Sequence, residues 1–162
     1  MPNRQREITL RFLAEPTDIN YGGKVHGGTV MKWIDQAAYA CAANWSGHYC
    51  VTVYVGGIQF HRPILISNLV EVHAKLIYTG NTSMHITVDV SAGDPMEGTY
   101  TPTTSCITVF VALDNEGKPT KVPTWKPETE EDQALARYAE KLMEIRETIK
   151  REMPPAPTEN TP

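Results

Sequence analysis

The sequence lacks an excess of positive charge, and it lacks a long apolar run. Its 15 lysines and arginines stand against 19 aspartates and glutamates, a net charge of −4. Nonspecific nucleic-acid binding requires a basic face that neutralises phosphates, so this class of function is disfavoured. No run of about 18 apolar residues is present, and the first 16 residues contain no stretch apolar enough for a signal peptide. We therefore expect a cytoplasmic protein without nucleic-acid or membrane partners.

Cysteine is also scarce. Cys41, Cys50 and Cys106 are odd in number, have apolar neighbours and form no C-x-x-C pair, which predicts reduced thiols packed as small hydrophobic side chains. The five histidines, at positions 26, 48, 61, 73 and 85, show none of the spacings typical of metal ligands. We expect neither a metal nor a cofactor.

The pattern of apolar residues predicts an α+β fold. The 162 residues suit one domain of ordinary size. Two-residue alternation, clearest at Val70–Tyr78 and Met84–Val90, indicates antiparallel strands with one covered face. Strands are expected at residues 7–14, 50–60, 69–80, 83–93 and 100–113, and one long helix at 28–45. That helix is apolar nearly all round, so we expect a curved sheet to wrap it and other elements to surround it.

Beyond this domain, assigned to residues 1–127, the sequence predicts an amphipathic helix at 128–153 and a disordered tail at 154–162. The apolar residues of the helix repeat at steps of three and four: Leu135, Tyr138, Leu142, Ile145 and Ile149. Such a seam is typical either of a helix lying on its parent domain or of a packing element between subunits. Both readings stay open at this point.

The segment 17–38 carries the most chemical information. Gly27 and Gly28 stand at the start of the apolar helix, where free backbone amides can polarise a carbonyl oxygen that approaches closely. Asp35 lies two turns further into the helix, and a carboxylate buried among apolar residues needs a partner or a catalytic role. Asn20, in the preceding loop, offers an amide that can both donate and accept hydrogen bonds.

Several motifs in this order resemble the hotdog-fold acyl-CoA thioesterases, particularly the short bacterial acyl-CoA hydrolases and the mammalian cytosolic enzymes. The resemblance covers about residues 6–124. It rests on the N-x-x-G-x-x-x-G-G loop from Asn20 to Gly28, followed by MKWIDQAA (31–38), VTVYVGGIQFHRP (51–63), YTGNTSM (78–84) and DNEGKP (114–119).

The resemblance implies hydrolysis of acyl-CoA to a free fatty acid and coenzyme A, which is a substrate and product rather than a cofactor. It assigns Asp35 as general base or nucleophile, Asn20 as the loop amide that completes the site, and the Gly27 and Gly28 amides as donors to the thioester oxygen. It also implies a homodimer with shared sites, Asn20 of one chain lying beside Asp35 of the other, and further assembly into a trimer of dimers. Candidate contacts to coenzyme A are then Arg62, the turn formed by Gly80, Asn81, Thr82 and Ser83, and Lys118.

Two other functions remain as alternatives. One is a non-catalytic acyl-CoA-binding or sensor protein, which the presence of Asn20 and Asp35 disfavours. The other is a hotdog acyl-CoA dehydratase or hydratase, which would need a histidine-led motif where this chain has Asn20. His26 is interpreted as a residue that shapes the loop. His61 stands where the family usually has an apolar residue, and its role is left open.

Overall fold

The computed structural model describes residues 3–157. The chain divides into two compact units, Met1–Lys126 and Pro127–Pro162, which are described separately. The first unit contains β1 (Glu7–Leu13), the short 3₁₀ helix η1 (Pro16–Asp18), α1 (Gly27–Ser46), β2 (Tyr49–Phe60), β3 (Leu69–Thr79), β4 (Ser83–Gly93) and β5 (Thr101–Leu113). The second contains α2 (Glu130–Glu152). Neither helix of the described chain is long and apolar enough to span a membrane.

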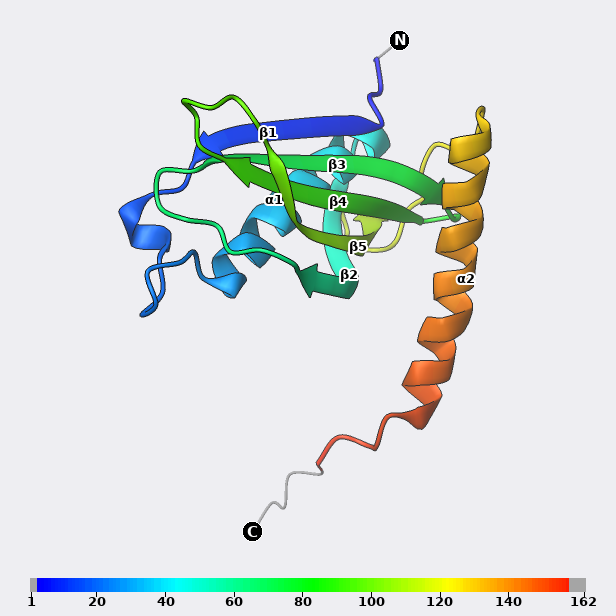
Figure 1. Cartoon of the computed structure of the whole chain (residues 1–162). Helices are drawn as coiled ribbons and strands as arrows, with labels where there is room; N and C mark the ends of the chain where they lie inside the picture. The colour runs from blue at the N-terminus through cyan, green and yellow to red at the C-terminus, as the bar shows by residue number, and fades with distance from the viewer. Residues whose placement is uncertain (1–2, 158–162) are drawn as a thin grey trace. The chain divides into compact units, whose positions relative to one another are not determined.

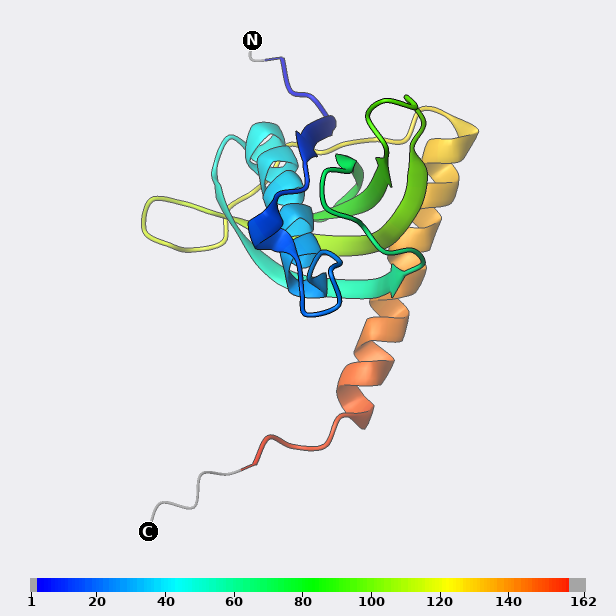
Figure 2. The same cartoon turned by 60° about the vertical axis from the view of Figure 1, so that its left-hand side comes forward.

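The five strands form one antiparallel sheet in the order β1-β3-β4-β5-β2. The sheet curves, and α1 runs along its inner side in contact with all five strands (Figures 1 and 2). The predicted architecture, an antiparallel sheet wrapped round one long helix, is confirmed. The two edge strands are β1 and β2, so each of them has one side without a partner strand.

The core follows from the alternation of β3 and β4. Apart from Ile77, their fully buried residues belong to the same core as the buried face of α1, and they oppose one another in the register, as Val72 does Val90 and Leu76 does Ile86. Tyr78 departs from the predicted face and is only half-buried. A register shift between Leu76 and Tyr78 is the reason, because an inserted residue reverses the alternation beyond it.

In the single chain only one side of α1 is covered, so the expectation that other elements surround this helix is wrong for one chain. Its buried residues form one face toward the sheet: Val30, Trp33, Ile34, Ala37, Ala38, Cys41, Ala42 and Ser46. Met31, Lys32, Asp35, Gln36 and Tyr39 are exposed on the other side. Apolar composition alone does not distinguish a face covered by the chain's own sheet from one open to another molecule.

In the second unit, α2 begins at Glu130 rather than at residue 128 because Thr129 caps it. The Thr129 hydroxyl accepts a hydrogen bond from the backbone N–H of Asp132 at 3.0 Å, and acidic residues occupy the first turn. Residues 154–157 have no regular secondary structure. The rest of the tail predicted at 154–162 lies outside the described residues. The two readings of the apolar seam remain predictions.

Candidate active site

The start of α1 presents free amides. His26 is the N-cap residue, and its carbonyl accepts the first helical hydrogen bond, from Val30 N–H at 3.1 Å. Among the described residues no side chain caps this end, so the amides of the first turn point outward without an intrahelical acceptor. A Cβ built on Gly28 meets no atom within 4 Å, which means that open space lies directly beside this amide.

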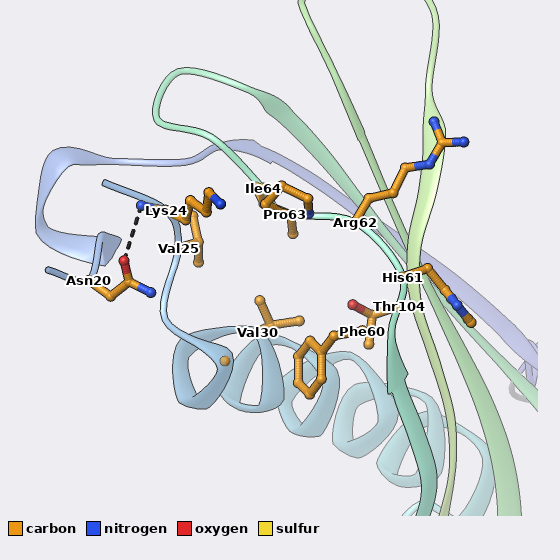
Figure 3. Close-up of a pocket in the computed structure, with 11 residues that line it drawn as sticks. Asn20, Lys24, Val25, Val30, Phe60, His61, Arg62, Pro63, Ile64 and Thr104 are labelled. Atoms are coloured by element: carbon orange, nitrogen blue, oxygen red, sulfur yellow. Dashed lines mark hydrogen bonds between the residues drawn. The ribbon is translucent and has the colours of Figure 1, made fainter. Parts of the chain in front are cut away.

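The loop before α1 is organised by Asn20. Its side-chain oxygen accepts hydrogen bonds from the backbone N–H groups of Gly22 at 2.9 Å and Lys24 at 3.2 Å. The amide nitrogen of Asn20 points the opposite way, toward the side on which Val25 and Val30 lie (Figure 3). The oxygen of Asn20 is therefore engaged within the loop, and its N–H₂ group is the part of the amide that remains as a donor.

A pocket of about 330 Å³ lies between this loop, the helix start and the end of β2. Its wall includes Asn20, Gly27, Phe60 and Arg62. Figure 3 shows the guanidinium of Arg62 directed away from the other labelled side chains. Lys24 and His61 also line the pocket, and both are exposed. The sequence did not single out Lys24, because a lysine in a polar loop carries no distinctive signal.

Asp35 lies on the open face of α1. The expectation of a buried carboxylate is wrong for the single chain, since Asp35 is exposed. Its Oδ1 accepts a hydrogen bond of 2.6 Å from the hydroxyl of Thr52 on β2. Thr52 was missed from the sequence, because the contact joins residues 17 positions apart and depends on how β2 crosses the helix. The hydrogen bond fixes one carboxylate oxygen and leaves Oδ2 for other chemistry.

A second pocket, of about 280 Å³, has Asp35 in its wall. The other lining residues are Met31, Ile34, Val55, Ile58 and Thr108. Asn20 and Gly27 do not belong to this pocket, and Asp35 does not belong to the first one. The structure of one chain thus places the predicted catalytic residues in two separate places.

Gly28 and Asp35 are seven residues apart, which puts them on the same face of α1 and about 10 Å apart along its axis. A catalytic group must lie about 3 Å from the atom on which it acts. The amides of one helix start and the carboxylate of the same helix therefore cannot reach one thioester carbonyl together.

The remaining candidates for coenzyme A contacts lie at the other end of β5. The turn from Gly80 to Ser83 is closed by Gly80 N–H donating to the Ser83 carbonyl at 2.9 Å, and its Thr82 carbonyl accepts from Ala112. Lys118 follows in the next loop, where its ammonium is 3.4 Å from the Glu116 carboxylate.

Arg62 shares the first pocket with Thr104 of β5, and eight residues of extended strand, about 27 Å, separate Thr104 from Ala112. One chain does not bring Arg62 together with Lys118 or the Gly80–Ser83 turn.

All three cysteines are free and buried, as predicted. Burial raises the pKa of Cys41 and of Cys106 to about 12. It also raises the pKa of Cys50. At neutral pH these thiols are protonated and enclosed, which excludes them as nucleophiles.

Comparison with known proteins gives concordant matches. A family model described as the thioesterase superfamily matches residues 22–99. The chain is 34% identical to protein VdlD of Helicobacter pylori over 132 residues, covering 82% of this chain and 74% of VdlD. It is 33% identical over 123 residues to the acyl-CoA thioester hydrolase YciA of Escherichia coli, covering 74% of this chain and 92% of YciA.

Among solved structures, an apo-hexameric acyl-CoA thioesterase superposes with a TM-score of 0.87 at 29% identity, covering 94% of this chain and 98% of the other. An acyl-CoA hydrolase from Staphylococcus aureus, solved with butyryl coenzyme A and coenzyme A, has a TM-score of 0.82 at 28% identity, over 91% of this chain and 90% of that one.

The Staphylococcus aureus hydrolase has also been solved with an asparagine, an aspartate and a threonine each replaced by alanine, at positions 15 and 17 residues apart. Asn20, Asp35 and Thr52 follow one another at these same two spacings. With relatives more than 30% identical over most of their length and a matching fold, the chain belongs to the thioesterase superfamily and has its hotdog fold.

Proposed function

We propose that this protein is an acyl-CoA thioesterase whose active sites form between two copies of the chain. The observation that carries the proposal is the division of the candidate groups along α1. Asn20 and the free amides lie at the helix start, and Asp35 with Thr52 lies about 10 Å further along the same open face. Each chain supplies two half-sites, and neither half-site is complete alone.

A two-fold axis relating two copies of the chain would join these half-sites into two complete active sites. If the axis crosses α1 midway between Gly28 and Asp35, close to Met31, an antiparallel copy of the helix brings the partner's Asp35 beside Gly28. The exposed apolar side chains favour such pairing, because Met31 and Tyr39 on α1 and Phe60 on the edge strand β2 are all open to solvent in one chain. Pairing along these surfaces would enclose Asp35, as the apolar sequence around it suggests. The hexameric relative supports further assembly into a trimer of dimers.

The chemistry then divides between the two chains. The amides of Gly27 and Gly28 donate to the thioester oxygen and stabilise the oxyanion that forms on it. The partner's Asp35 takes a proton from water through the carboxylate oxygen that Thr52 leaves free, and the resulting hydroxide attacks the carbonyl carbon. The C–S bond breaks, the thiolate of coenzyme A takes up the proton, and the fatty acid leaves. The N–H₂ group of Asn20 donates a hydrogen bond to the substrate or to the water.

Direct attack by Asp35 is the second mechanism compatible with this arrangement. In that case an Asp35 oxygen forms a mixed anhydride with the acyl group, coenzyme A leaves, and water then cleaves the anhydride. The same hydrogen bond from Thr52 would orient the attacking carboxylate. Both mechanisms require Asp35 in contact with the thioester carbonyl or with the water beside it.

Binding of coenzyme A requires cations and amides for its phosphates, since the chain as a whole is acidic. Arg62 and Lys24 would serve this purpose beside the helix start. The Gly80–Ser83 turn and Lys118, at the far end of β5, would reach the same nucleotide only from another chain of the assembly. This division is a further reason to expect the oligomer to be the active form.

The test is hydrolysis of acetyl-, hexanoyl- and palmitoyl-CoA, followed by the release of free thiol. Asp35→Asn should lower kcat by a factor of about 10² to 10⁴, the usual contribution of a general base. The dimer should persist, because asparagine has nearly the size of aspartate and keeps an oxygen that can accept the hydrogen bond from Thr52. Gln36→Ala, the adjacent exposed position on α1, is the control and should retain full activity.

Two results would select another function. Tight binding of coenzyme A with no thiol release from any of the three esters would indicate a sensor. Loss of water from a 3-hydroxyacyl-CoA without thiol release would indicate a dehydratase.

A further inference from the structure

We infer that α2 is a second contact surface of this protein, at which it pairs antiparallel with α2 of another copy of the chain. The surface is the apolar seam of the helix, formed by Leu135, Tyr138, Leu142, Ile145 and Ile149. Tyr138, Ile145 and Ile149 are exposed, with exposed fractions of 49%, 44% and 53%. The buried residues of α2, Asp132 and Ala139, lie about a quarter of a turn round the helix from the seam. The seam is therefore an apolar face that stays open in the described part of the chain.

The width of the seam favours a second helix over a lipid surface as its occupant. The five residues recur at steps of three and four, which confines them to the narrow stripe typical of a coiled coil. A helix that binds a membrane surface has a wider apolar face and a basic polar face. In α2, five basic residues stand against seven acidic ones, a net charge of −2, and an anionic membrane would repel this helix.

The charges at the two ends of α2 specify how the second copy runs. Glu130, Glu131 and Asp132 occupy the first turn, and Lys150 and Arg151 the last. An antiparallel pair places the acidic start of each helix at the same end as the basic end of the other, and the two helix dipoles then oppose one another. A parallel pair would bring the acidic first turns of both copies together, which is unfavourable.

The residues that flank the seam exclude the parallel arrangement independently. In the heptad that begins at Leu135, Lys141 is the g position and Arg146 the e position. In a parallel pair g meets e, so Lys141 would lie beside the partner's Arg146 and the two cations would repel. In an antiparallel pair g meets g, and Lys141 then lies beside the partner's Thr148. A pair shifted by one heptad would instead place Lys141 beside its own copy.

This register also covers the exposed part of the seam. Its two-fold axis crosses α2 between Leu142 and Ile145, so Leu142 packs on the partner's Ile145 and Tyr138 on the partner's Ile149. These four apolar layers are few for two free chains, since coiled coils usually extend over three or four heptads. The contact is expected where another surface, such as the open face of α1, already holds the chains together, because the second contact is then intramolecular.

Cysteine cross-linking of the full chain tests the pairing. The three native thiols are buried and protonated, so an introduced cysteine on α2 is the reactive one. With a short bismaleimide, Ile145→Cys should join most chains in pairs, since the two copies of this position lie about 4–5 Å apart along the helices. Ile149→Cys alone should not, because its copies lie about 16 Å apart, whereas the double variant Tyr138→Cys/Ile149→Cys should join chains again. Glu147→Cys, exposed on the opposite side of α2, is the matched control and should not cross-link.

A charge placed in the seam should weaken the assembly. Ile145→Lys puts two ammonium groups at the centre of the pair, and the protein concentration at which the assembly half-dissociates should rise at least tenfold in analytical ultracentrifugation. Gln133→Lys adds the same charge at an exposed position on the opposite side of α2 and should leave this concentration within twofold. Equal helix content of both variants in circular dichroism would separate loss of pairing from loss of the helix.

The inference is overturned if Ile145→Cys cross-links no better than Glu147→Cys, or if Ile149→Cys alone cross-links as well as Ile145→Cys, which would indicate a parallel pair. Co-sedimentation of the unsubstituted protein with phosphatidylglycerol vesicles, lost in Ile145→Lys, would assign the seam to a lipid surface instead. None of these measurements uses thiol release, so the pairing of α2 and the proposed function can fail separately.

Discussion

Two inactive variants of this protein should restore activity when their chains are mixed. Asn20→Asp keeps the side-chain oxygen that accepts from Gly22 and Lys24, so the loop is preserved, but it removes the N–H₂ donor. Asp35→Ala removes the carboxylate. In a site shared between chains, one chain must supply Asn20 and the other Asp35. A dimer with one chain of each variant therefore contains one intact site and one site that lacks both the Asn20 amide and the Asp35 carboxylate.

When equal amounts of the two variants are dissociated in urea and refolded together, a site is intact only if its Asn20 comes from an Asp35→Ala chain and its Asp35 from an Asn20→Asp chain. With random pairing, about a quarter of all sites meet both conditions. The mixture should therefore show about a quarter of the unsubstituted activity in the thiol-release assay, while each variant refolded alone stays near the background.

A shared site is expected because about 10 Å separates Gly28 from Asp35 along one helix. A matched control mixes the unsubstituted chain with a chain that carries both substitutions. Shared sites again give about a quarter of the activity, whereas sites complete within one chain give about a half. No recovery in the first mixture, together with half activity in the second, would refute the shared site.

Three further outcomes are expected. Thr52→Val should lower kcat about tenfold, because Asp35 loses the hydrogen bond of 2.6 Å that orients it. Thr52→Ser keeps the hydroxyl and should retain most of the rate. Equal values of kcat for the two variants in steady-state kinetics would contradict this role of Thr52. Gly28→Ala should raise the free energy of unfolding in urea by about 0.5–1 kcal/mol. The same substitution should raise KM several-fold, because the added methyl enters the open space beside the amide, and an unchanged KM would place the substrate elsewhere. The raised pKa values of Cys41 and Cys106 predict a loss of stability at high pH, because the thiols of the unfolded chain ionise at lower pH than those of the folded protein. The contribution of these two thiols to the free energy of unfolding should be complete below about pH 9 and should disappear toward pH 12. Urea unfolding at pH 7 and pH 10 should show a loss of about 1 kcal/mol for each thiol, and Cys106→Ala should show a smaller loss.

Much of the fold could be predicted from the sequence, because its elements have clear periods. Alternation in β3 and β4 marks which residues face the helix, and Gly27–Gly28 marks where the helix begins. The predicted ends of the five strands, of α1 and of α2 lie within two residues of the observed ones, whereas η1 was expected as part of a loop. Two smaller differences have local causes: the shifted register at Tyr78, and the capping of α2 by Thr129.

The candidate site was predictable only in part. Asn20 and Asp35 stand out because a polar residue in a glycine loop and an acid in an apolar helix are unusual. Thr52 does not stand out, since a threonine in a strand is ordinary and its contact with Asp35 depends on the path of β2. The exposure of Asp35 could not be predicted either, because the sequence of one chain does not say which of its apolar faces the sheet covers.

The enclosure of the three cysteines has a consequence for an enzyme that would release a thiol at every turnover. Thiol–disulfide exchange requires an accessible thiolate, and here each sulfur is both buried and held in its protonated form. Oxidised coenzyme A therefore has no sulfur on this protein with which to form a mixed disulfide. Coenzyme A, the product of the proposed reaction, can therefore accumulate and even be oxidised without forming a disulfide with the protein.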